Sequence, residues 1–205
     1  MKDIAVNGIS KSFGEKKVLE NFSAVFPAGK TTCIMGESGS GKTTLLRMIL
    51  GLEHPDQGSI EGNAGPMSVV FQEDRLCEGF SSAVNAGMVL NDKEDKKSAE
   101  KMLEEMGMKD DIDTPVSQLS GGMKRRVAIA RALVFRGEWL IMDEPFKGLD
   151  EDTRAKVIDV IKNNYDSVIM VTHSIDEAKL MNAQIVELGD NNPADGYHLR
   201  LPDTN

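Results

Sequence analysis

The sequence predicts an α/β fold with a mostly parallel sheet, an antiparallel β subdomain at the start of the chain and a short helical subdomain. Three observations support this prediction. A glycine-rich stretch, GESGSGKTT at 36–44, lies between an apolar run suited to a buried strand (31–35) and a segment with apolar residues at helical spacing (43–52). From residue 139 onward, short apolar strands alternate with amphipathic helices, as in parallel sheets. Residues 4–13 and 17–26 predict two antiparallel strands around a turn.

The organisation of the chain predicts one domain over residues 1–205, since this length supports a single well-buried core. A β-rich stretch at 58–71 precedes a change of composition towards Ala, Met, Lys and Glu at 81–107. We place a helical subdomain at about residues 73–136, inserted in the core. One helical face there carries Ala99, Met102, Leu103 and Met106, either as an adaptable contact surface or, more commonly, as core.

The last part of the chain is predicted to alternate strands with helices, which implies a largely parallel sheet. Predicted strands cover 139–142, 167–171 and 184–188, and predicted helices cover 151–162 and 174–181. Ser174 and Glu177 match a capping box, which starts a helix immediately after His173 and puts that histidine at the carboxyl end of a strand.

Composition excludes several classes of function. A net charge of −9 disfavours wrapping of a nucleic-acid backbone or an anionic membrane, so no nucleic-acid partner is expected. The two cysteines, Cys33 and Cys77, indicate neither a disulfide framework nor a zinc cluster, and a reducing cytosol fits best. No apolar run approaches the roughly 20 residues that cross a bilayer, and the first residues lack the apolar core of a signal peptide. Any role at a membrane is therefore expected to come through a partner.

The glycine-rich stretch fits the pattern G-x-x-x-x-G-K-[ST] of a phosphate-binding loop, and its strand–loop–helix context argues against an ordinary glycine-rich turn. Glycines allow successive backbone N–H groups to face a phosphate, at the positive end of the next helix. Lys42 would bridge the β- and γ-phosphates, and the Thr43 hydroxyl would bind Mg²⁺. The sequence therefore predicts a P-loop NTPase core that binds ATP with Mg²⁺ through Gly36, Glu37, Ser38, Gly39, Ser40, Gly41, Lys42, Thr43 and Thr44.

Two further groups of polar residues follow predicted strands. In WLIMDEP, Asp143 and Glu144 come directly after a buried strand, at the edge where α/β proteins bind ligands. Asp143 is suited to hold Mg²⁺, and Glu144 is suited to polarise the attacking water. A solvated acidic turn before Pro145 is the alternative. His173 follows SVIMV and could reach the same edge to contact the γ-phosphate, although a lone histidine after a strand is usually structural.

A second candidate anion site precedes the helix MKRRVAIARALVF, whose apolar positions Val127, Ala130, Ala132, Leu133 and Val134 predict a buried helix. In LSGGM at 119–123, Ser120, Gly121 and Gly122 are expected to contact a nucleotide at the start of that helix. One nucleotide needs only one phosphate loop, so this second site suggests that the ATP of another molecule docks here. The alternative is that Ser120 only caps the helix.

The complete set resembles the ATPase subunit of ATP-binding cassette (ABC) transporters from about residue 4 to residue 188, and is most like subunits of nitrate, sulfonate and taurine importers. In that family the phosphate loop is followed by a glutamine loop, matched by Gln72 in VVFQEDRL, then by the signature LSGG, the acidic strand end and a switch histidine. Phe13 in SKSFG matches the position of an adenine-stacking aromatic, although it could equally belong to the core. FKGLD resembles the family's dimer-contact loop. Met123 and Gly148 depart from the usual Gln and Ala.

The resemblance implies an ATPase in which Glu144, His173, Lys42 and Gln72 are the catalytic residues and Thr43, Gln72 and Asp143 bind Mg²⁺. It further implies a homodimer formed on ATP binding, an integral membrane permease as partner, and an extracytoplasmic solute-binding protein in the same system if the system imports. The chain would then lie at the cytoplasmic face of the cell membrane. Import of a small solute is the first hypothesis. An exporter or lipoprotein-release complex, a soluble non-transport ABC ATPase and, least favoured, a small P-loop kinase are the alternatives.

Overall fold

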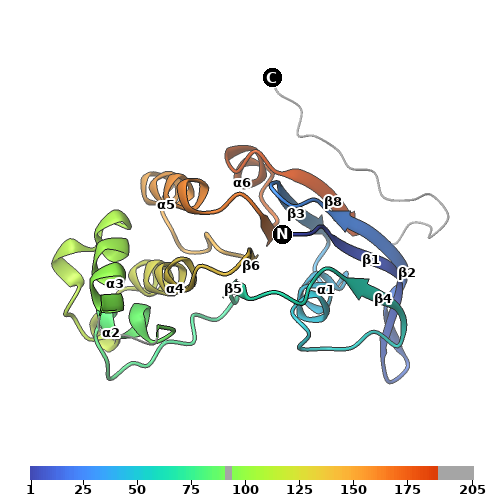
Figure 1. Ribbon diagram of the computed structural model, residues 1–205, viewed down its shortest axis with the longest axis horizontal. Helices are drawn as coiled ribbons and strands as arrows, with labels where there is room; N and C mark the ends of the chain where they lie inside the picture. Colours follow the sequence, from blue (N-terminus) through green and yellow to red (C-terminus); the bar gives the residue numbers. More distant parts are fainter. Residues whose placement is uncertain (91–93, 189–205) are drawn as a thin grey trace. The chain divides into compact units, whose positions relative to one another are not determined.

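The computed structural model describes residues 1–90 and 94–188, with side chains described from residue 97 onward in the second range (Figure 1). The chain divides into two compact units, which are described in turn. The first joins Met1–Pro66 with the described residues from Asp166 onward, and the second is Met67–Tyr165. No helix among the described residues is both long and apolar enough to cross a bilayer.

The first unit contains an antiparallel sheet in the order β2 (Lys16–Phe26), β1 (Ile4–Phe13) and β4 (Gln57–Glu61). The predicted hairpin at the start of the chain is therefore confirmed, and Gly14 lies in its turn at φ +60°. Residues on one face of the two long strands are buried, because alternate side chains of a strand point to the same side. They are Ile4, Val6, Ile9, Phe22, Ala24 and Phe26.

The same unit contains three parallel strands, with β3 (Thr31–Gly36) between β7 (Val168–Val171) and β8 (Gln184–Leu188). The helix α1 (Lys42–Ile49) follows β3, and α6 (Ile175–Leu180) lies between β7 and β8 in the chain. Every residue of β7 is buried and apolar, and β3 and β8 are buried at their central residues, 32–34 and 185–186.

Helix α1 ends three residues before the predicted end at residue 52, and glycine is the reason. Gly51 takes φ +68°, and its N–H donates to the Met48 carbonyl at 3.0 Å. The N–H of Leu52 donates to the Arg47 carbonyl at 2.8 Å. This pair of bonds is a Schellman cap, which terminates a helix at a residue in the left-handed conformation.

The second unit is built on two parallel strands, β5 (Met67–Val70) and β6 (Trp139–Asp143). Helix α4 (Gly121–Phe135) contacts β5 and helix α5 (Glu151–Asn164). All five positions predicted to be buried in α4 are buried, which confirms that prediction. Every residue of β6 is buried.

The helices of the second unit pack around α4. Helices α2 (Ser82–Gly87) and α3 (Glu94–Glu105) contact each other and α4, and the 3₁₀ turns Lys109–Asp111 and Val116–Gln118 follow. The face of Ala99, Met102, Leu103 and Met106 is buried, so the methionine stripe is core and not an exposed contact surface. The expected boundaries of the helical subdomain, about 73–136, fall inside this unit and stay a prediction.

Candidate functional site

The glycine-rich loop joins β3 to α1 within the first unit. Gly36, Gly39 and Gly41 all have positive φ, at +151°, +85° and +96°, a range that side chains disfavour. Gly39 has no heavy atom within 4 Å of the position a Cβ would occupy, and Glu37, Ser38 and Gly39 are exposed. The loop therefore presents open backbone at the N-terminus of α1, whose first turn contains no acidic residue.

Lys42 is the first residue of α1, and its side chain folds back over the loop. Its Nζ donates to the carbonyl oxygens of Gly36 at 2.9 Å and Glu37 at 2.7 Å, and the residue is 6% exposed. The next residue, Thr43, is exposed. A fixed positive charge inside the loop beside an accessible hydroxyl is the arrangement expected for a triphosphate with Mg²⁺.

His173 reaches the same edge of the sheet as this loop. In the parallel pairing of β3 with β7, Ile34 is opposite Val171, and Gly36 and His173 each come two residues later in the chain. Within the first unit, the exposed His173 and the phosphate loop therefore follow the carboxyl ends of two adjacent strands.

The turn that carries His173 is held by two buried residues, Thr172 and Glu177. The Thr172 hydroxyl donates to the Glu177 carboxylate, and the Ser174 N–H donates to the Thr172 oxygen at 3.1 Å. The Ser174 hydroxyl accepts from the Glu177 N–H at 3.3 Å, which confirms half of the predicted capping box. The other half differs, because the Ser174 N–H donates to the Thr172 hydroxyl oxygen. In a complete capping box this N–H would donate to the glutamate side chain.

Phe13, at the end of β1, is 50% exposed and is therefore not a core residue. Lys11 lies beside it, with Nζ 5.3 Å from the ring centroid. Lys11 is itself held by Glu53 at 2.8 Å and Asp56 at 3.2 Å, and its hydrogen bond to Glu53 raises the pKa of the Lys11 ammonium. An exposed aromatic face supported by a tethered cation is suited to stacking against a planar ring.

Gln72 and the two acids lie in the second unit, where β5 and β6 supply them to one edge. Val70 is opposite Met142 in this parallel pair, and Gln72 and Glu144 each come two residues later in the chain. Asp143 ends β6 and is 7% exposed, Glu144 is half-buried and Gln72 is exposed. The structure therefore brings all three predicted residues to the carboxyl ends of adjacent strands.

Glu144 has an unusual backbone conformation, with φ +48°. Non-glycine residues in this left-handed region cost about 1–3 kcal/mol and are held there by surrounding contacts. The following Pro145 adds to this cost, because a residue before proline prefers an extended conformation. Such strain, at a carboxylate predicted to act in catalysis, indicates a side chain aimed by its backbone.

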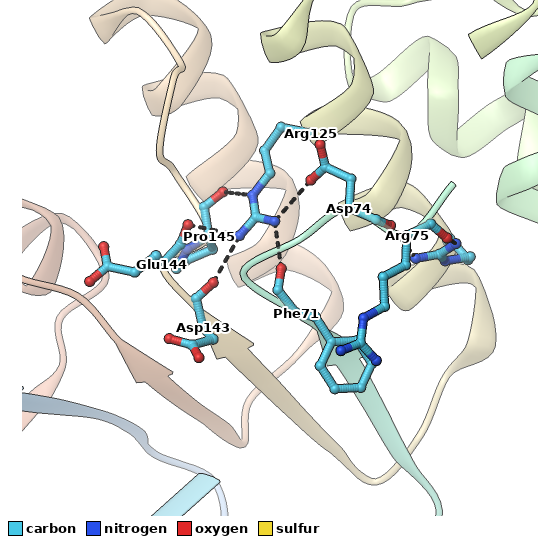
Figure 2. A network of polar contacts seen from close by, with 8 residues as sticks. Phe71, Asp74, Arg75, Arg125, Asp143, Glu144 and Pro145 are labelled. Carbon is cyan, nitrogen blue, oxygen red and sulfur yellow. Dashed lines mark hydrogen bonds and ion pairs between the residues drawn. The ribbon is translucent and has the colours of Figure 1, made fainter. Parts of the chain in front are cut away.

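Figure 2 shows how this strained turn is held. Arg125 of α4 donates to three successive carbonyl oxygens, from Nη2 to Asp143 at 2.9 Å and Glu144 at 2.7 Å, and from Nε to Pro145 at 2.8 Å. Its Nη1 donates to the Phe71 carbonyl at 2.6 Å and to Asp74 Oδ1 at 3.0 Å. Arg125 is 3% exposed and is not among the site residues predicted from the sequence.

The signature segment also lies in the second unit, at the start of α4. Ser120 is an exposed N-cap whose hydroxyl accepts from the Met123 N–H at 3.3 Å. Gly122 packs closely against the 146–150 loop, since a Cβ added there would lie 3.2 Å from the Gly148 carbonyl oxygen. Gly121 and Ser120 remain exposed at the N-terminus of a 15-residue helix, a position that suits an anion.

The predicted residues thus fall into two sets. The first unit contains the phosphate loop, Phe13 and His173, and the second contains Gln72, Asp143, Glu144 and the signature. Among the described residues, no group of three or more His, Cys, Asp or Glu side chains is arranged to hold a metal ion without further ligands. A metal bound here therefore needs oxygen ligands from a nucleotide or from hydroxyl and amide side chains, which are the ligands Mg²⁺ commonly takes beside phosphates.

Comparison with known proteins identifies related sequences over almost the whole chain. The family described as ABC transporter matches residues 19–147. The aliphatic sulfonates import ATP-binding protein SsuB 1 of Paracoccus denitrificans is 35% identical over 97% of this chain and 84% of its own length. SsuB 2 of Pseudomonas syringae pv. syringae is 35% identical over 97% of this chain and 74% of its own length.

Solved structures agree with the sequence comparison. A dimeric structure of MJ0796, a bacterial ABC transporter cassette, superposes with a TM-score of 0.82 at 27% identity and covers 91% of this chain and 94% of the other. A post-hydrolysis dimer of the same cassette, bound to ADP and Pi, gives a TM-score of 0.81 at 27% identity, over 90% of this chain and 94% of the other. The predicted α/β fold with a phosphate-loop core is thereby confirmed.

Proposed function

The chain belongs to the ABC transporter family as an ATP-hydrolysing subunit, and we propose that it dimerises on ATP to drive a membrane permease that imports a small solute. The observation that carries the proposal is the register of the parallel strands. The phosphate loop and His173 follow the paired strands β3 and β7, and Gln72 and Glu144 follow the paired strands β5 and β6.

The phosphate loop fits the triphosphate of ATP. Three glycines with positive φ leave backbone N–H groups free of side chains, and Lys42 supplies a charge already directed into the loop. Phe13 offers an exposed ring for the adenine. Thr43, Gln72 and Asp143 are the residues proposed to hold Mg²⁺, which when bound would neutralise charge that develops on the phosphates.

Glu144 is proposed as the residue that accepts a proton from the attacking water. Its carboxylate is half-buried at the end of β6, and the left-handed turn fixes the direction of the side chain. His173 is proposed to donate a hydrogen bond to the γ-phosphate, and the Thr172–Glu177 bond holds the turn that presents it. Gln72 would sense the nucleotide beside Glu144.

A homodimer is proposed because the signature segment is a second anion site. Ser120 and Gly121 are exposed at the N-terminus of α4, where backbone N–H groups and the hydroxyl favour a phosphate. A head-to-tail pair would place the signature of one subunit on the ATP bound by the other. Hydrolysis would then remove bridging charge and let the subunits separate.

The permease is proposed as a separate chain, so this subunit would be attached to the cytoplasmic face of the membrane through a partner. The curated relatives described above are named as sulfonate import proteins, and this supports import of a small sulfonate. An extracytoplasmic solute-binding protein would deliver the solute in such a system.

Replacement of Glu144 by glutamine tests the catalytic part of the proposal. Glu144→Gln keeps the shape of the side chain and removes its basicity, so we expect ATP binding at the parental affinity, turnover lowered by at least about 10²-fold and a dimer that persists with ATP. Steady-state ATPase assays, nucleotide titration and size-exclusion chromatography measure these quantities. Parental turnover in the variant would exclude Glu144 as the base.

Purification from membranes tests the transport part. The tagged chain, extracted in mild detergent, is expected to retain an integral membrane protein, and ATPase activity of the reconstituted complex should rise with a sulfonate-loaded binding protein. Recovery of the chain from the extract without a bound membrane protein, together with turnover that added membrane extract does not change, would contradict a role in transport.

A further inference from the structure

The Arg125 guanidinium joins the two segments that supply Gln72 and Glu144. It has five N–H groups and makes five hydrogen bonds, to the carbonyls of Asp143, Glu144, Pro145 and Phe71 and to the Asp74 carboxylate. We propose that Arg125 is a positioning residue for catalysis. It sets the direction of the Glu144 carboxylate and links the turn of Glu144 to residues 71–74, the segment that contains Gln72. This inference rests on the proposed role of Glu144 as base.

The geometry of the 143–145 turn is the first argument. Three consecutive carbonyl oxygens face one side chain, and their partial negative charges would repel one another without a cation between them. The turn also contains Glu144 at φ +48° before a proline, a conformation the backbone does not favour on its own. Arg125 compensates for both effects, since its Nε and Nη2 donate to all three carbonyl oxygens (Figure 2).

The second argument is the choice of side chain. A guanidinium is a rigid planar fork with donors on two edges, whereas an ammonium is a compact charge with three donors at one atom. Nε and Nη2 of Arg125 contact the 143–145 turn, and Nη1 contacts Phe71, the residue before Gln72. Lysine cannot span both segments, so the structure predicts that charge alone will not replace Arg125.

The third argument concerns the helix that carries Arg125. It is the fifth residue of α4, one turn after the Ser120 N-cap of the signature. A displacement of the signature end of α4 therefore acts on the Glu144 backbone through a single buried side chain. In the proposed dimer, contact of a partner's nucleotide with the signature would reach the base in this way.

Arg126 provides a matched control on the same helix. Its Nη1 donates to the carbonyls of Met106 at 3.0 Å and Gly107 at 3.1 Å, the two residues that follow α3 in the chain. Arg126→Lys therefore loses backbone hydrogen bonds of the same kind without touching the 143–145 turn. It reports the cost of weakening the packing of α4 alone.

The experiment compares Arg125→Lys, Arg125→Gln and Arg126→Lys in the full chain, measuring kcat, KM for ATP, nucleotide affinity and Tm. For both Arg125 variants we expect kcat lower by about 10²-fold, because a misplacement of about 1 Å at a catalytic group has this effect. We expect KM and nucleotide affinity to change less than about threefold, since the phosphate loop is unaltered. Arg126→Lys is expected to lower Tm with kcat within about twofold of the parent.

Combination with Glu144→Gln separates positioning from packing. If Arg125 acts through Glu144, the double variant Arg125→Lys/Glu144→Gln should turn over no more slowly than Glu144→Gln alone. An additional loss equal to that of Arg125→Lys would overturn the proposal. Equal kcat values for Arg125→Lys and Arg126→Lys would also overturn the proposal for Arg125. The proposed role of Glu144 would still stand in that case, as long as Glu144→Gln is inactive.

The glutamine variant guards against misfolding, because it introduces no unpaired charge into the buried site. If Arg125→Lys does not fold, Arg125→Gln carries the same comparison of kcat with KM. Failure of both variants to fold, with Arg126→Lys folded, would reduce Arg125 to a packing residue and overturn its role in catalysis. Parental turnover in Glu144→Gln would instead remove the proposed base itself.

Discussion

Substitution of Gly36 by alanine tests the packing of the phosphate loop, with Gly39→Ala as its matched control. A methyl group on Gly36 would lie 2.1 Å from the carbonyl oxygen of Leu188 and 2.9 Å from Ser40 Oγ. Gly36 pairs with Leu188 in the β3–β8 ladder, so the clash involves backbone that cannot turn away. At Gly39 a methyl group meets no heavy atom within 4 Å.

The expected magnitudes follow from this difference. Both glycines have positive φ, and alanine there costs about 1–3 kcal/mol of the free energy of unfolding. Contact between carbon and oxygen normally begins near 3.3 Å, so Gly36→Ala must also separate β3 from β8 by about 1.2 Å. Overpacking of this kind adds about 1–3 kcal/mol. The cost of positive φ is common to both variants, so at about 2–4 °C per kcal/mol the overpacking alone should make Gly36→Ala melt roughly 2–12 °C below Gly39→Ala.

Thermal denaturation of both variants without nucleotide, followed by circular dichroism, measures the difference. Purified parent chain supplies the reference Tm under the same buffer and heating rate. Equal melting temperatures for Gly36→Ala and Gly39→Ala would refute the reasoning, because they would mean that the loop moves away from Leu188 without cost.

Three other predictions concern nucleotide binding, dimerisation and pH. Lys42→Ala removes a charge-assisted contact and should weaken ATP binding by about 10- to 100-fold, measured by nucleotide titration. Unchanged affinity would contradict the proposed contact of Lys42 with the phosphates. Met123→Gln should tighten the ATP-dependent dimer in sedimentation experiments, and monomer in both forms with ATP would reject this. Hydrogen bonds from the Thr153 N–H and hydroxyl lower the pKa of Asp150 below its usual 3.8. The stability this gives is present above that value and lost as pH falls through the folded pKa, so the Tm of Asp150→Asn should fall less steeply than that of the parent below about pH 4.

The phosphate loop and the strand ends could be predicted from the sequence because their signals are local. GESGSGKTT specifies its own turn through glycines at 36, 39 and 41, and apolar runs mark the strands on either side of the loop and before the acids. The same runs predicted β6 and β7 to within one residue of their bounds. The end of α1 was missed, because the apolar pattern continues through Leu52 while Gly51 stops the helix.

Arg125 could not be assigned a role from sequence, because its partners are distant along the chain. Arg125 lies in the run KRR, and such a run of basic residues is typical of a solvated surface. The contacts of Arg125 lie 18 to 20 residues away at the acidic turn, and 54 and 51 residues away at Phe71 and Asp74, on either side of Gln72 in the chain. One signal was available: Arg125 lies four residues before Ile129, on the buried face of α4, where a charge requires partners.

The contacts of Lys42 have a consequence for the thermodynamics of ligand capture. A free lysine side chain samples many rotamers, and immobilising one costs up to about 2 kcal/mol. Here the bonds to the Gly36 and Glu37 carbonyls order the four-carbon stem during folding. A phosphate arriving at the loop meets an ammonium that is already oriented, so this entropy loss does not weaken association.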